Sequence, residues 1–204
     1  HEELCLIRAE RTLGCGDVLE VTDPDIIDPN NVNSPAGAVA LYAGSVGEWS
    51  FAVVGDAGGQ EGIILVGGLM SDEYVHSGTF PTRLEYEQRK IDERNGTLTL
   101  VFRQLQRARS LAEATIPRLR QYAPTPRSRI GEMWALSGLA YVYIGESYCS
   151  GVPFSNLDPI VYGIPLTTTQ IFDSALARFD SALTADSGST AIAVPAIPTT
   201  TRIA

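Results

Sequence analysis

The longest apolar stripe in the chain, over residues 95–122, constrains the fold more than any other feature of the sequence. Apolar side chains recur there every three or four residues, as one buried face of an α-helix requires. The stripe consists of Leu98, Val101, Phe102, Leu105, Ala108, Ala112, Ile116 and Leu119, and largely excludes Arg103, Gln104, Arg107 and Arg120. We therefore predict a long amphipathic helix with a solvated basic side, kinked near its end by Pro117.

Two shorter segments on either side of this stripe also have helical periodicity. Residues 35–54 place apolar side chains at spacings of three and four, with Ser34 suited to the N-cap and Pro35 to the first helical position. Residues 129–146 are apolar on more than one face, which predicts a mostly buried helix with Ser128 as its cap.

A fourth helix is predicted over residues 166–183. Thr167 and Gln170 have the spacing of a capping box, in which each side chain satisfies a backbone donor at the start of the helix. Short breaking segments join these helices, as expected for antiparallel neighbours. The sequence thus predicts a mainly α fold of tetratricopeptide-like helix pairs with irregular loops.

The same patterns divide the chain into three regions. Residues 1–32 form an irregular leader, because prolines alternate with aspartate and asparagine, and residues 33–186 form the helical domain. Residues 187–204 lack periodicity and are expected to be an irregular tail. Inside the helical domain, residues 55–83 are rich in glycine and predict a long ordered loop, whereas residues 83–94 suit either a short helix or an extended arm.

Charge and hydropathy restrict the classes of partner. The formal net charge of -9 would repel nucleic-acid phosphates, so no nucleic-acid partner is expected. No run approaches the roughly 18 consecutive apolar residues of a membrane-spanning helix, so contact with a membrane is expected only through a lipid anchor. The apolar fraction of 44% is enough to supply a hydrophobic core.

Few residues suit catalysis or metal binding. The two histidines are His1 and His76, and the pair Asp72 and His76 has helical spacing but no third metal ligand nearby. The glycine-rich segment lacks the lysine of a phosphate-binding loop and the GxGxxG of a dinucleotide site. We therefore expect no catalytic residue, no metal, no cofactor and no enzyme activity.

The predicted loop over residues 55–83 is the best candidate for a binding site. Long ordered loops in compact domains are often functional, and this one combines polar side chains with aromatic rings that can stack on a sugar or peptide. The predicted ligand-binding residues are Asp72, Glu73, Tyr74, His76, Phe80 and Arg83, with Tyr148 as a further loop aromatic. Packing is the expected role of Trp134, Tyr141, Tyr143 and Phe179, which lie on helical stripes.

The three cysteines invite different interpretations. The context of Cys15, Thr12-Leu13-Gly14-Cys15, loosely resembles a bacterial lipobox, so Cys15 is either a candidate lipidation site or an ordinary cysteine. Cys149 lies in the stretch GESYCSGVPFS, residues 145–155, where the helix ends at Gly151 and Pro153. Cys149 is expected to be a small buried hydrophobe or one half of a disulfide.

In this order, the motifs resemble the SusD/RagB-like outer-membrane nutrient-binding lipoproteins. The resemblance covers residues 15–186 and rests on the lipobox-like cysteine, the acidic leader, the first helix and four segments: LMSDEYVHSGTFPTR, TLTLVFRQLQRARSLAE, GEMWALSGLAYVYIGESYCSGVPFS and LTTTQIFDSALARFDSAL. Arg109 departs from the family, which often has asparagine there. Because members of this family are more than twice as long, the chain is expected to be an N-terminal part or a short version.

The resemblance implies both a location and a function. It implies a lipid-anchored protein on the surface of a bacterial outer membrane, or an extracellular one, that binds oligosaccharides or peptides without catalysis. It also implies delivery of that ligand to a SusC-like TonB-dependent transporter, over which the protein acts as a lid. The alternative interpretation is a helical-repeat scaffold that assembles with itself and binds no small ligand.

Overall fold

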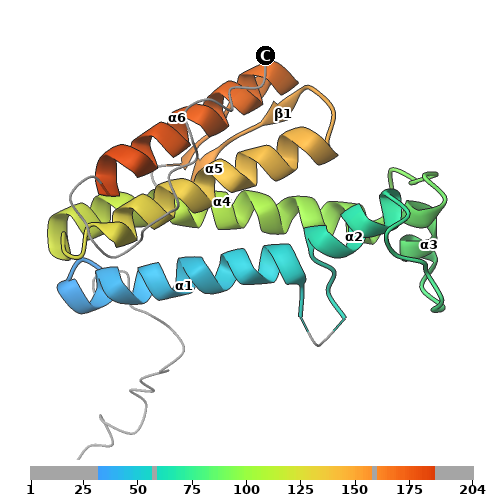
Figure 1. Ribbon diagram of the computed structural model, residues 1–204, viewed down its shortest axis with the longest axis horizontal. Helices are drawn as coiled ribbons and strands as arrows, with labels where there is room; N and C mark the ends of the chain where they lie inside the picture. Colours follow the sequence, from blue (N-terminus) through green and yellow to red (C-terminus); the bar gives the residue numbers. More distant parts are fainter. Residues whose placement is uncertain (1–31, 57–58, 158–159, 187–204) are drawn as a thin grey trace, which may run out of the picture.

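The computed structural model describes residues 32–56, 59–157 and 160–186, and these residues form a mainly helical fold (Figure 1). Four long helices dominate: α1 (Pro35–Val54), α4 (Gly96–Tyr122), α5 (Ser128–Ser147) and α6 (Thr168–Asp186). The predicted mainly α class is confirmed. The predicted leader with Cys15, up to residue 31, and the predicted tail over residues 187–204 lie outside the described residues.

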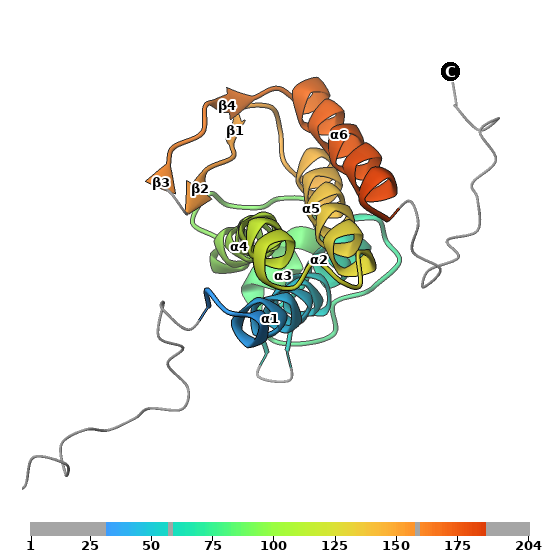
Figure 2. The ribbon, with the colours of Figure 1, turned by 90° about the vertical axis from the view of Figure 1, so that its left-hand side faces the viewer.

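The four long helices are arranged in chain order, and each runs opposite to the one before it (Figure 1). Seen from one end, α4 lies between α1 and α5, and α6 covers the far side of α5 (Figure 2). The apolar core has two parts along α4. One contains Val101 and Leu105 together with Tyr141, and the other contains Ile116 and Leu119.

The predicted long helix is confirmed as α4, which continues through Pro117. Asn95 is its N-cap, and the Asn95 side chain accepts a hydrogen bond of 3.1 Å from the backbone N–H of Leu98. One part of the prediction is wrong. Gln104 is only 5% exposed and Arg109 only 2%, so the polar side of α4 is partly covered by other segments.

The prediction of one long loop over residues 55–83 is also wrong. The apolar run there forms α2 (Ile63–Met70), and α3 (Pro81–Glu87) follows after a short connection. Gly68 lies inside α2 against the ring of Tyr74, and a Cβ at this position would collide with that ring. Gly68 therefore permits close packing within a short helix, whereas Gly55 and Gly59 have positive φ in the turn before it.

The ends of the other helices confirm two of the predicted caps and contradict a third. The Ser34 side chain caps α1, and Thr167 and Gln170 form the predicted capping box of α6, with hydrogen bonds of 2.9 and 3.3 Å. The predicted cap of α5 is wrong, because Arg127 occupies the N-cap position and no side chain caps that helix. Gly151, with φ of 100°, supplies the unusual backbone angle expected after α5.

Two small β-ribbons connect α5 to α6. Strand β1 (Val152–Pro153) pairs with β4 (Pro165–Leu166), and β2 (Asn156–Leu157) pairs with β3 (Ile160–Val161), both antiparallel. Cys149 precedes these ribbons and is exposed, so the prediction of a buried cysteine is wrong. The other two cysteines, Cys5 and Cys15, lie outside the described residues, and the alternative of a disulfide stays a prediction. The β2–β3 ribbon lies beside α4, on the side away from α1, whereas β4 of the other ribbon contacts α6 (Figure 2).

The first helix is apolar over its whole length, although polar residues interrupt its apolar runs. By length and composition alone, α1 could cross a membrane, and 17% of its most apolar window is buried within the described part of the protein. Its polar groups are nevertheless paired with the bundle. Ser45 lies 2.9 Å from the Thr115 hydroxyl of α4, and Tyr42 donates a hydrogen bond of 2.5 Å to Glu132 of α5.

Candidate functional site

The six residues predicted to bind a ligand lie on and around α2 and α3. Arg83 donates a hydrogen bond of 2.7 Å to Glu61, and its guanidinium lies 4.4 Å from the centre of the Phe80 ring. Asp72, in the left-handed region with φ of 63°, pairs with Arg89. Arg83 and Phe80 therefore contact each other, whereas Asp72 contacts Arg89.

The other three predicted residues are also separated. Tyr74 packs on Gly68 and is 43% exposed, and Glu73 is exposed. The backbone N–H of His76 donates a hydrogen bond of 3.2 Å to Glu87. None of the six residues lines the depression described next, so any ligand that they bind must lie on this exposed surface.

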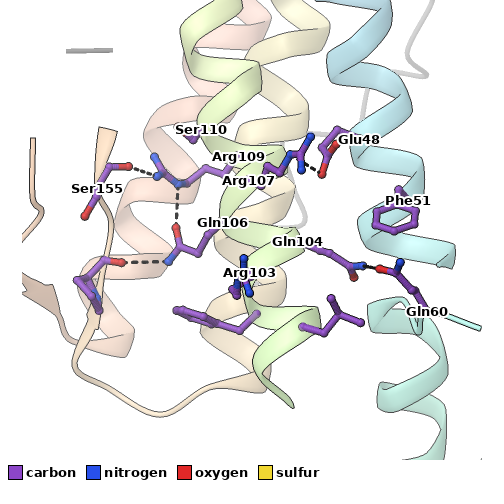
Figure 3. A pocket seen from close by; sticks show the side chains of 13 residues that line it. Glu48, Phe51, Gln60, Arg103, Gln104, Gln106, Arg107, Arg109, Ser110 and Ser155 are labelled. Atoms are coloured by element: carbon purple, nitrogen blue, oxygen red, sulfur yellow. Dashed lines mark hydrogen bonds and ion pairs between the residues drawn. The ribbon is translucent and has the colours of Figure 1, made fainter. Parts of the chain in front are cut away.

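A depression of about 600 Å³ lies along the first half of α4 and is bordered by Gln60 (Figure 3). We refer to it as the α4 depression. One wall comes from α1 and the following turn, through Glu48, Phe51 and Gln60, and the other comes from the connection after α5, through Pro153 and Ser155. Its floor consists of Leu100, Phe102, Arg103, Gln104, Gln106, Arg107, Arg109 and Ser110 of α4.

Gln104 is the least satisfied polar side chain on this floor. Its Nε2 donates a long hydrogen bond of 3.4 Å to Oε1 of Gln60, across the gap between α4 and the turn after α1. Its Oε1 is buried and has no hydrogen-bond partner among the described residues. An unpaired buried acceptor destabilises a folded protein, so such an atom at the edge of a depression suggests a functional role.

Three arginines line the depression and differ in whether their guanidinium groups already have a partner in the protein. Arg107 pairs with Glu48 of α1 at 3.1 Å, although its side chain remains 70% exposed. Arg109 is buried and fully bonded. Arg103 is exposed and, among the described residues, has neither an ion-pair partner nor a hydrogen-bond partner. Figure 3 places Arg103 between Gln104 and Gln106 on the open side of α4.

The buried Arg109 fixes the wall formed by the connection after α5. Its Nε donates a hydrogen bond of 3.2 Å to Gln106, and its Nη2 donates to the carbonyl of Ser155. Gln106 in turn donates a hydrogen bond of 3.0 Å to the carbonyl of Pro153 (Figure 3). Two side chains of α4 thus hold Pro153 and Ser155 in place, which gives the depression a defined shape.

The charge of Arg109 is balanced behind the depression by Glu113. Glu113 lies 2.7 Å from Arg109, accepts a hydrogen bond of 2.8 Å from Ser137 of α5, and lies 3.1 Å from Nε of Arg178 of α6. Arg178 also donates a hydrogen bond of 3.0 Å to the hydroxyl of Tyr141. One carboxylate therefore connects α4, α5 and α6 at the level of the depression.

The aromatic pair beside this network has a structural role. The rings of Tyr141 and Phe154 stack with their centroids 4.4 Å apart, and the guanidinium of Arg178 lies 4.4 Å from the Tyr141 ring. Burial, followed by the charge of Glu113, raises the pKa of Tyr141 above its ordinary value, although Arg109 and Arg178 oppose this effect. Tyr141 therefore remains a neutral hydrogen-bonding phenol.

Sequence reasoning missed most of the depression because its walls come from distant segments. Nothing in the sequence shows that Gln60 lies over Gln104, 44 residues away. The stretch GVPFS did suggest a defined turn, and its Pro153 and Ser155 do line the site. Within the parts of the chain that the structure describes, no three His, Cys, Asp or Glu side chains are grouped as a metal site would require.

Tyr148, the further loop aromatic, is not free to bind a ligand. Its ring packs edge-on against Phe102 with centroids 5.0 Å apart, and its side chain lies against the apolar core. Burial raises the pKa of the Tyr148 hydroxyl above its ordinary value, with the neighbouring Tyr86 as a smaller cause.

Comparison with known proteins adds no further assignment: no family model, no curated protein and no solved structure matches this chain.

Proposed function

We propose that this protein is a non-catalytic, SusD-like nutrient-binding protein that captures an oligosaccharide or peptide. The α4 depression is the observation that carries the proposal. It presents apolar surface from Phe51 and Phe102 beside amides from Gln60 and Gln104. A sugar ring has apolar C–H faces and hydroxyl edges, so it matches a surface that combines aromatic rings with hydrogen-bonding amides.

The arrangement of helices is consistent with this proposal. The antiparallel helices α5 and α6 supply a candidate tetratricopeptide-like pair, and Gly138 of α5 lies against the ring of Phe179 of α6. We further propose that the protein acts at the surface of a bacterial outer membrane, anchored through Cys15, and passes its ligand to a SusC-like TonB-dependent transporter. The exposed β-ribbons, with Tyr162 87% exposed, offer a surface for such a partner.

Isothermal titration calorimetry with a panel of oligosaccharides and peptides tests the binding function. The variant Phe51→Ala should weaken binding at least severalfold, because it removes the aromatic ring from one wall of the depression. The variant Phe80→Ala is the matched control at the exposed surface around α3. A reversed result would place the ligand at the predicted residues Asp72, Glu73, Tyr74, His76, Phe80 and Arg83, and no binding by any member of the panel would contradict the proposed function.

A second candidate function rests on the outer face of α6. Leu176 and Leu183, two turns apart, are 62% and 67% exposed, and single-sided apolar exposure of this kind suits contact with another helix. The protein would then be a self-assembling helical-repeat scaffold. Sedimentation of the intact chain, of the double variant Leu176→Ser with Leu183→Ser, and of a chain lacking residues 187–204 distinguishes the two functions. Ordered oligomers that are lost in either altered chain favour the scaffold, and a monomeric intact chain excludes it.

A further inference from the structure

We propose that the ligand of the α4 depression carries a carboxylate, and that it is an acidic oligosaccharide built from uronic acids. This inference rests on the proposed binding function and specifies its substrate class. Arg103 would bind the carboxylate, and the amides of Gln60 and Gln104 would bind the hydroxyl groups of the sugar.

The local charge of the depression is the first reason. Three arginines and one glutamate line it; Arg107 pairs with Glu48 and Arg109 with Glu113, so the charge of Arg103 remains unbalanced there, whereas the whole chain has a formal net charge of -9. At physiological ionic strength, exposed charges more than about 8 Å apart are largely screened from one another. A bound anion therefore responds mainly to the nearby guanidinium groups and much less to the acidic remainder of the surface.

The availability of Arg103 is the second reason. Arg107 already has Glu48 as a partner at 3.1 Å, and Arg109 is bonded to Gln106, Glu113 and Ser155. Arg103 is exposed at the open side of the depression and has no such partner among the described residues. Its planar guanidinium has the fork of donors that matches the two oxygens of a carboxylate.

The unpaired oxygen of Gln104 is the third reason, and it favours a sugar acid over a simple anion. An acceptor on the floor is complemented by a ligand with hydroxyl donors, which a uronic acid has next to its carboxylate. This oxygen is covered in the present conformation. A ligand hydroxyl would reach it only after the Gln104 side chain turns, and the one hydrogen bond that holds this amide, of 3.4 Å to Gln60, is long.

A comparison of trigalacturonate with its fully methyl-esterified form tests the inference. The two molecules share their hydroxyl groups, and the ester carries a methyl group on each carboxyl in place of the negative charge, so the salt dependence below separates charge from bulk. Calorimetry with the full chain should show about tenfold tighter binding of the acid, as expected for one charge-assisted hydrogen-bonded pair. The acid should lose affinity between 0.05 and 0.5 M salt, whereas the ester should not.

The variant Arg103→Gln should lower the affinity for the acid about tenfold, and should lower the affinity for the ester much less, so that the preference for the acid is lost. Arg94→Gln is the matched control, because its side chain is 87% exposed, is outside the depression and carries the same charge change. Equal binding of acid and ester by the native chain would overturn the inference and leave the proposed function intact. Tighter binding of acidic peptides than of trigalacturonate would also overturn it, and absence of binding by every sugar and peptide would overturn both.

Discussion

Arg109 and Glu113 form an ion pair of 2.7 Å one turn apart on α4, and Arg109 is only 2% exposed. The pair is stabilised by contacts from three other segments, since Ser155, Ser137 and Arg178 all bond to it. A buried charge that loses its partner destabilises a protein strongly. The back of the α4 depression therefore depends on one carboxylate.

The variant Glu113→Gln keeps the shape of the side chain and removes its charge. We expect a loss of about 3–5 kcal/mol in the free energy of unfolding, because Arg109 would remain buried without an opposite charge. Urea denaturation followed by circular dichroism measures this loss. Asp92→Asn is the control, since the Arg94–Asp92 pair at 3.3 Å is exposed and should contribute less than about 1 kcal/mol. Equal losses in the two variants would contradict the assigned role of Glu113.

The neighbouring glutamines should respond in opposite ways to the same substitution. Gln104→Met removes an unpaired buried oxygen, so the free energy of unfolding should stay the same or rise by about 1 kcal/mol, while ligand affinity falls. Gln106→Met removes hydrogen bonds to Arg109 and Pro153 and should lower the free energy of unfolding by about 1–3 kcal/mol. Thermal unfolding of both variants provides the comparison. A destabilised Gln104→Met would show that this side chain is structural.

Tyr42 should ionise later than an ordinary tyrosine. Its hydrogen bond to Glu132, followed by burial and the charge of Glu132, raises the pKa of Tyr42 to about 12. A pKa that is higher in the folded than in the unfolded state contributes stability at pH values below 10, and this contribution is lost as the pH rises from 10 towards 12.

Absorbance at the phenolate band during a titration with base measures this directly. Tyr42→Phe should remove one late-titrating phenol and make the free energy of unfolding less sensitive to pH in that window. Tyr86, whose pKa burial also raises to about 12, should still titrate late and serves as the internal reference. If Tyr42→Phe instead removes a phenol that titrates at the ordinary value of about 10, the hydrogen bond from Tyr42 to Glu132 does not form.

Two helical glycines should respond differently to alanine. A Cβ at Gly138 would lie 2.7 Å from the Phe179 ring, so Gly138→Ala should separate α5 from α6 and cost about 1–3 kcal/mol. A Cβ at Gly47 in α1 would meet nothing within 4 Å, so Gly47→Ala should stabilise the protein by about 0.5–1 kcal/mol through helix propensity. Guanidinium denaturation of both variants tests the contact, and a stabilised Gly138→Ala would contradict it.

The long helices are predictable from the sequence because helical periodicity and capping hydrogen bonds involve residues that are close together in the chain. The stripe of α4, the Ser34 cap and the Thr167–Gln170 box are of this kind. The same reasoning failed at α2, where glycine that usually marks a loop instead permits contact with Tyr74. Local composition cannot separate these two uses of glycine.

The candidate site was harder to predict because its residues meet only through tertiary packing. The apolar periodicity predicts Gln104 on the solvated side of α4, but Gln60 covers it from a distant turn. The i,i+4 spacing of Arg109 and Glu113 on the predicted helix is local, but the burial of this pair and its bonds to Ser155, Ser137 and Arg178 arise only on folding. The identity of a buried polar partner therefore requires the three-dimensional structure.

The most direct test of ligand binding in the α4 depression is a two-dimensional NMR titration of the full chain with trigalacturonate and its methyl ester. Side-chain amide signals of Gln60, Gln104 and Gln106 should shift with both sugars, and the Nε–H signal of Arg103 should shift with the acid alone. Shifts confined to residues 72–83, or no shifts with either sugar, would contradict the assignment of the α4 depression as the binding site.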